Sequence, residues 1–139
     1  MHTGRMLFAQ VIEYAPRYEF QKCVARYQGN HRVRSFTCWD QLLCLIFAQL
    51  TYRESLRDIV ACLRSVDGRL YHMGIRGTVS RSTLAEANEQ RDWRIYADFA
   101  QVLIRQARQL YAGEPFGVDV AQTVYAFDST TIDLCMSLF

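Results

Sequence analysis

A nearly continuous apolar run, residues 42–50 (Leu-Leu-Cys-Leu-Ile-Phe-Ala-Gln-Leu), constrains the fold of this chain more than any other stretch. A helix formed by this run is apolar on almost every face, and such a helix is stable in water only when neighbouring elements bury it. Thr37 and Asp40 precede the run, and either can cap the start of the helix. The run therefore predicts a buried central helix, with Leu45 and Ile46 in the core.

Amphipathic segments flank this central helix. Residues 6–15 and 18–28 precede it, and a third segment begins at Ser55, which can cap a helix. The apolar residues of these segments recur at three- and four-residue spacing: Leu7, Phe8, Val11, Ile12, Phe20, Val24, Tyr27, Leu56, Ile59, Val60 and Leu63. This periodicity predicts helices that each bury one face against the centre.

A longer helical pattern follows Ser80 and continues to about Tyr111, with a break near Arg91. Its predicted apolar stripe consists of Tyr96, Phe99, Val102, Leu103, Ala107 and Leu110. The pattern adds one or two further helices to those around the central run.

Two segments lack helical periodicity. The short basic segment 31–36 is either a loop or a brief extended piece. The segment 66–78 contains three glycines and is predicted to be a loop, with a short turn at residues 70–72. Apart from these connections, the pattern predicts an all-helical body for residues 5–112.

Residues 55–63 followed by residues 79–88 have the arrangement of a helix-turn-helix, a motif that binds DNA. The second helix would begin with exposed polar side chains of the kind that contact phosphates and base edges. The candidate DNA-contacting residues are Arg76, Ser80, Arg81, Ser82 and Thr83. About fifteen residues separate the two helices, whereas the standard motif has a turn of three or four. The alternative interpretation is an ordinary helical bundle in which residues 80–83 only cap a helix.

Charge is distributed unevenly along the chain, although the formal net charge is only +2. Residues 1–85 carry twelve Arg or Lys against six Asp or Glu, and residues 86–139 carry four against eight. All but one of the basic residues are arginine, whose planar group suits phosphates and guanine edges. The basic half favours a polyanion such as double-stranded DNA as the partner. The alternative interpretation is that these arginines only reflect coding composition and lie on solvated helix faces.

Cysteine usage and hydropathy favour a cytoplasmic protein without membrane association. The five cysteines are Cys23, Cys38, Cys44, Cys62 and Cys135. Their odd number and the lack of a Cys-x-x-Cys pair argue against a zinc site or a disulfide framework, and favour small core residues. No apolar run approaches the roughly 18–20 residues that span a bilayer, and the amino terminus lacks the apolar core of a signal peptide.

The carboxyl-terminal stretch 123–139 has a different pattern. Residues 124–127 are apolar and rich in β-branched and aromatic side chains, which suits a strand buried on both faces. Asp128 follows at once, then two small hydroxyl residues that favour a turn, and then a second run of strand-forming residues. A carboxylate at the end of a buried strand is held by rigid backbone and suits a metal site. The alternative is an Asp that only ends the strand.

Residues 125–139 (Tyr-Ala-Phe-Asp-Ser-Thr-Thr-Ile-Asp-Leu-Cys-Met-Ser-Leu-Phe) resemble the first catalytic strand of bacterial insertion-sequence transposases of the IS-four type. These are DDE enzymes with an RNase H-like core. Residues 55–59, 82–88 and 91–93 are similar to the amino-terminal domain of that family. The resemblance implies that Asp128 is the first of three acids that hold Mg²⁺ for catalysis. It also implies a DNA partner, the terminal inverted repeats of a transposon.

The resemblance divides the chain into three parts: a helical DNA-binding domain (1–112), a linker (113–122), and a truncated β-hairpin that begins an RNase H-like α/β core (123–139). Two Gly and one Pro within residues 113–117 mark the boundary. The family's second Asp and its Glu are missing, because the sequence stops eleven residues after Asp128. The chain alone is therefore expected neither to cut nor to join DNA, and Mg²⁺ is expected only in a full-length core.

Three functions remain open from the sequence. The chain is the amino-terminal DNA-binding part of a DDE transposase, or a stand-alone, non-catalytic regulatory protein, or an inert transposase remnant. A regulatory protein would occupy transposon ends or pair with itself or with full-length transposase. Affinity for DNA separates the remnant from the other two.

Overall fold

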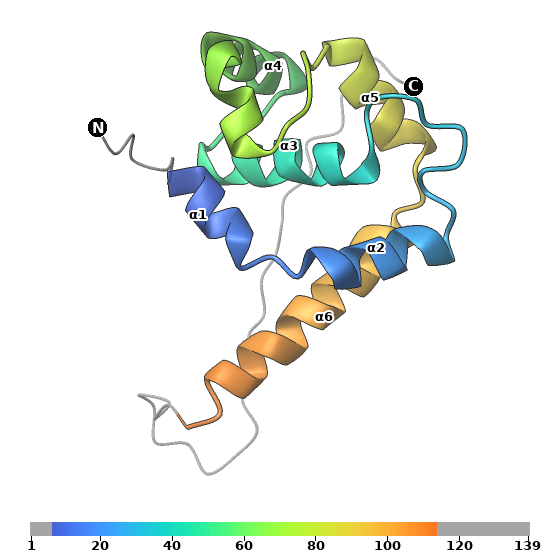
Figure 1. Cartoon of the computed structure of the whole chain (residues 1–139), viewed down its shortest axis with the longest axis vertical. Coiled ribbons are helices and arrows are strands. Elements are labelled where there is room, and N and C mark those ends of the chain that lie inside the picture. The colour runs from blue at the N-terminus through green and yellow to red at the C-terminus, as the bar shows by residue number, and fades with distance from the viewer. Residues whose placement is uncertain (1–6, 114–139) are drawn as a thin grey trace, which may run out of the picture.

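A computed structural model describes residues 7–113 of the chain, and the described part is helical (Figure 1). Its elements are α1 (Leu7–Glu13), α2 (Arg17–Arg26), α3 (Cys38–Leu50), α4 (Leu56–Ser65), the 3₁₀ helix η1 (Asp67–Met73), α5 (Arg81–Gln90) and α6 (Arg94–Leu110). No strand occurs within residues 7–113. The prediction of a mainly helical fold is confirmed, while the predicted β-hairpin at 123–139 lies outside the described residues.

The central helix α3 begins with a reciprocal cap formed by both residues that the sequence suggested. The Thr37 hydroxyl oxygen accepts a hydrogen bond from the backbone N–H of Asp40 at 3.2 Å. The Asp40 carboxylate in turn accepts one from the backbone N–H of Thr37 at 2.8 Å. Two backbone donors that a helix start leaves without partners are thereby satisfied.

Helix α3 divides the core into two clusters because opposite faces of it are buried. Leu43, Cys44 and Ala48 lie in the first cluster, with apolar residues of α4, η1 and α5. Leu42 and Cys38 lie in the second, with apolar residues of α2 and α6. Figure 1 shows α3 between these two groups of helices. The predicted central position of the apolar run is therefore correct.

The carboxyl-terminal part of α3 is less buried than its composition suggests. Leu45 and Ile46 are only partly buried, and the Leu50 side chain is 51% exposed. The prediction that Leu45 and Ile46 are core residues therefore needs correction. The sequence shows that the helix is apolar all round, but the surrounding helices cover mainly its first half.

The segment predicted as the loop 66–78 contributes to the core instead. The predicted turn at residues 70–72 lies inside η1, and the neighbouring Leu70 and Met73 are 4% and 1% exposed. They are three residues apart, which is one turn of a 3₁₀ helix. The three glycines of the segment make it look like a loop. Gly74 ends the element with a φ of 82°, a conformation in which glycine carries little strain.

The helical pattern after Ser80 breaks where the sequence indicated, between Gln90 and Arg94, and gives α5 and α6. Helix α6 packs on α2 through its first turns, where Ile95 and Phe99 are buried. Its predicted stripe is only partly buried, since Leu103 and Leu110 are 39% and 79% exposed. In Figure 1 the orange end of α6 extends beyond the other helices, which explains the difference.

Among the helices of residues 7–113, none combines the length and the apolar character needed to cross a bilayer.

Candidate nucleic-acid interface

The two helices of the predicted DNA-binding pair pack against each other. Helix α4 buries Ile59, Val60 and Leu63, and α5 buries Leu84 and Ala87. The polypeptide between them contains η1 and is itself part of the core. The pair therefore has the contact of a helix-turn-helix but a longer, structured connection.

The start of α5 brings four of the five candidate DNA-contacting residues into one helical turn. Ser80 is the N-cap, and its hydroxyl oxygen accepts from the backbone N–H of Thr83 at 3.1 Å. The same hydroxyl lies 2.9 Å from the Ser82 hydroxyl and 2.8 Å from the Thr83 hydroxyl. Ser80 and Thr83 are partly buried, whereas Arg81 and Ser82 are exposed. Arg76, the fifth candidate, is exposed on the connection that precedes α5.

A groove of about 530 Å³ separates α5 from the basic segment 31–36. His31, Arg32 and Arg34 contribute to one wall of the groove. Thr83, Glu86 and Gln90 of α5 contribute to the other. The sequence predicts a loop or a brief extended piece at 31–36 and does not connect it with α5, because some fifty residues separate them in the chain.

Arg91, just after α5, joins the two walls through partly buried hydrogen bonds. Its guanidinium donates to the Thr37 carbonyl at 2.9 Å, to the Gln41 side-chain oxygen at 2.8 Å and to the Phe36 carbonyl. The same guanidinium lies 5.3 Å from the centre of the Phe36 ring. Arg91 thus fixes the end of segment 31–36 relative to α5.

Gln41 is the centre of this polar network and is only 2% exposed. Its side-chain oxygen also accepts from the Tyr96 hydroxyl at 2.6 Å, and its amide donates to the Asn88 side chain. Burial raises the pKa of the Tyr96 phenol, so the hydroxyl keeps the proton that it donates. The network connects α3, α5 and α6, and no local sequence signal indicates it.

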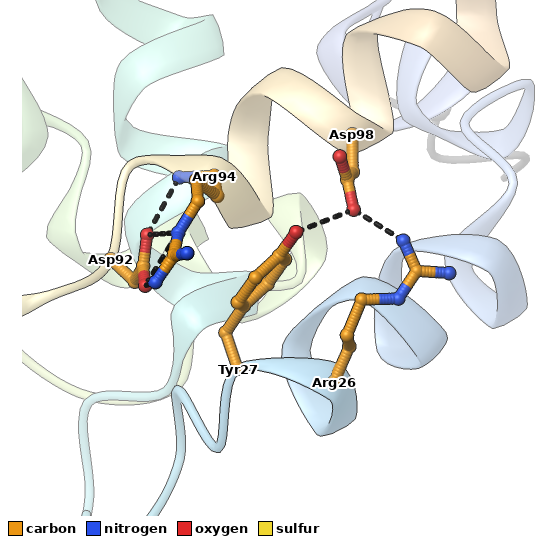
Figure 2. Close-up of polar contacts among 5 residues, drawn as sticks. All are labelled: Arg26, Tyr27, Asp92, Arg94 and Asp98. Carbon is orange, nitrogen blue, oxygen red and sulfur yellow. Dashed lines mark hydrogen bonds and ion pairs between the residues drawn. The ribbon is translucent and has the colours of Figure 1, made fainter.

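A second polar group joins α2 to α6 (Figure 2). The Asp98 carboxylate accepts from the Tyr27 hydroxyl at 3.0 Å and pairs with the Arg26 guanidinium. Arg94 pairs with Asp92 at 2.6 Å, and its guanidinium lies 4.8 Å from the centre of the Tyr27 ring. Hydrogen bonds from Arg94 lower the pKa of the Asp92 carboxyl, which therefore stays ionised at neutral pH.

The structure gives no metal site in the helical part. Within residues 7–113, no three His, Cys, Asp or Glu side chains gather closely enough to hold a metal ion. Asp128, predicted to be the catalytic and metal-binding acid, lies outside the described residues. The four described cysteines are free, and Cys23, Cys38 and Cys44 are buried as predicted for core residues.

Comparison with known proteins gives one match. A family model described as a domain of unknown function, DUF4372, covers residues 3–76, which is more than half of the chain. No curated protein and no solved structure matches the chain. The matched residues extend from before α1 to beyond η1 and include segment 31–36, whereas α5 and α6 lie after them.

Proposed function

The chain belongs to the DUF4372 family, and we propose that its helical part binds double-stranded DNA as the amino-terminal portion of a transposase. This domain family is typical of transposase-like proteins. The observation that carries the proposal is the exposed first turn of α5, a helix that packs on α4. Arg81 and Ser82 in this turn face solvent.

The first turn of α5 suits a polyanion for two physical reasons. The first backbone N–H groups of a helix have no acceptor within it, and the helix dipole makes this end positive. The Ser80 hydroxyl oxygen accepts a hydrogen bond from the backbone N–H of Thr83. The backbone N–H groups of Arg81 and Ser82 come before it, at the first two positions of the helix. Arg81 on α5 and Arg76 on the connection before it add two exposed positive charges.

In this proposal the transposon ends are the target, and DNA cutting and joining belong to a longer chain. The proposed catalytic core is of the DDE type and would use Asp128 as the first of three acids that hold Mg²⁺. Such a core places two ions about 4 Å apart, which requires several converging carboxylates. Within residues 7–113 no such set of acids gathers, and the role that we propose for this part is binding. A chain that binds transposon ends without this core would act as a regulator, which is the alternative.

The test is a titration of fluorescent DNA duplexes with the 139-residue chain at salt concentrations from 50 to 200 mM, roughly the range over which phosphate contacts weaken strongly. The variant Arg76→Ala/Arg81→Ala should bind more weakly, and the slope of log affinity against log salt should fall by about 1.8, or about 0.9 for each lost phosphate contact. The matched control is Arg105→Ala/Arg108→Ala, which removes two exposed charges from α6.

Equal losses in the two double variants would show that only total charge matters and would contradict the placement of the interface at α5. Absence of salt-dependent binding by the unaltered chain would contradict the proposed function itself.

A further inference from the structure

We propose that segment 31–34 is a second phosphate-binding element, which contacts the backbone of the same duplex from the opposite wall of the groove beside α5. Arg32 and Arg34 are the contacting residues. The inference rests on the proposed DNA binding and adds to it the place of the second contact. It is carried by the rigidity of the segment, by the free charges of the two arginines and by the acid on the facing wall.

The beginning of the segment is held against the core. Gly29 lies so close to the second core cluster that a Cβ atom there would meet the Cys38 sulfur at 2.8 Å. The Asn30 side-chain oxygen accepts from the backbone N–H of Cys38 at 2.8 Å. The His31 backbone N–H donates to the Gln28 carbonyl at 2.8 Å. The backbone therefore enters the segment in one conformation.

The backbone just after the segment is held by Arg91 through the carbonyls of Phe36 and Thr37. Between the two anchors, Arg32 has a φ of 59°, in the left-handed region that few residues other than glycine adopt. Such backbone strain persists only where the surrounding structure imposes it, and it concentrates at binding sites. A segment fixed in this way presents its side chains with little loss of conformational entropy on binding.

Arg32 and Arg34 are both exposed, with the half-buried Val33 between them. Within residues 7–113, no carboxylate forms an ion pair with either of them. By contrast, Arg26 and Arg94 on the adjoining α2–α6 surface are paired with Asp98 and Asp92. The two arginines of the segment are therefore available to an external anion.

Glu86 on the facing wall disfavours a phosphate on the α5 side of the groove. Its carboxylate accepts from the Gln90 amide at 3.2 Å and contributes negative charge to the wall. A phosphate placed beside Glu86 would be repelled, whereas Arg32 and Arg34 on the other wall would attract it. Glu and Gln side chains instead suit the donors and acceptors of base edges. Phosphates would then lie at the rim that Arg32 and Arg34 form, away from Glu86. Arg81, at the start of α5, would contact the duplex outside the groove.

The experiment measures duplex binding by the full chain and by Arg32→Asn/Arg34→Ala. Asparagine is chosen at residue 32 because it tolerates the left-handed backbone better than alanine does. We expect the salt slope to fall by about 1.8, as for two lost phosphate contacts. The affinity should fall by the same factor on two duplexes of equal length and unrelated sequence, because phosphate contacts carry no sequence information.

Two further variants complete the test. Arg32→Lys/Arg34→Lys keeps both charges and should retain most of the slope, and Arg105→Ala/Arg108→Ala controls for total charge. Thermal unfolding of each variant separates lost contacts from lost structure, and Arg34→Ala alone, away from the strained residue, should still lower the slope by about 0.9.

The inference would be overturned if Arg32→Asn/Arg34→Ala and Arg34→Ala both kept the salt slope of the unaltered chain. If Arg76→Ala/Arg81→Ala still lowered that slope, the proposed function would stand. No binding by the unaltered chain would overturn both. A loss confined to one of the two duplexes would assign base reading, not phosphate contact, to the segment and would also overturn the inference.

Discussion

A Cβ atom on Gly29 would lie 2.4 Å from the Cδ1 atom of Ile95, much closer than two carbon atoms can approach. Ile95 is completely buried, so its side chain cannot move aside without disturbing the second core cluster. We therefore expect Gly29→Ala to lower the free energy of unfolding by about 1–3 kcal/mol through overpacking. Chemical denaturation followed by circular dichroism measures this change.

Gly68→Ala is the matched control for Gly29→Ala, since a Cβ atom there meets no other atom within 4 Å. It should leave stability unchanged or raise it slightly, because alanine restricts the unfolded chain. Similar destabilisation by both substitutions would show that the close contact at Gly29 is not the cause.

Leu43→Ala should be among the more damaging substitutions in α3. Leu43 is completely buried in the first cluster, and truncation of a buried leucine leaves a cavity that costs about 2–5 kcal/mol. Leu50→Ala, in the same helix but half exposed, should change stability by less than about 0.5 kcal/mol. Urea titrations of the two variants compare them directly, and equal losses would contradict the unequal burial of α3.

Arg91→Lys should destabilise the chain although it keeps the positive charge. Lysine cannot reproduce the planar set of donors that reaches Phe36, Thr37 and Gln41, so these partly buried acceptors lose hydrogen bonds. We expect a cost of about 1–3 kcal/mol. Arg94→Lys is the control, since its exposed ion pair with Asp92 tolerates a different geometry. Equal stability of the two variants would contradict a structural role for Arg91.

Stability should fall as the pH rises above about 9, the ordinary value for a thiol. Burial raises the pKa of the Cys44 thiol to about 12, so this thiol stays protonated in the folded chain but ionises in the unfolded chain. The unfolded state then binds fewer protons, and the free energy of unfolding decreases between these two pH values. Cys44→Ala should reduce this slope in urea titrations at pH 8, 9 and 10. An identical slope in both proteins would contradict the raised pKa.

Helix starts could be predicted from the sequence because capping is local. Thr37, Ser55 and Ser80 each cap a helix through a residue three positions further on, which the sequence shows directly. The break between α5 and α6 was likewise visible. The sequence also predicts the helix pair that α4 and α5 form, and the exposure of Arg81 at the start of α5.

Other features depend on contacts that no local pattern contains. The hydrogen bonds of Arg91 connect residues at least fifty positions apart, so sequence periodicity cannot indicate the groove that they shape. The sequence overestimates how much of the apolar stripe of α6 is buried, because periodicity shows that a face is apolar but not what covers it. DNA binding and the role of Asp128 stay predictions.

Because α3 is buried on two faces, adjacent residues of this helix evolve under different packing constraints. Leu42 shares its surroundings with Phe20 and Phe99, whereas Leu43 shares its own with Leu63 and Met73. A change of side-chain volume at one position is compensated mainly within its own cluster, because close-packed interiors transmit volume changes to their direct neighbours. Among homologous chains, Leu42 and Leu43 should therefore covary with separate sets of residues, although a single peptide bond joins them.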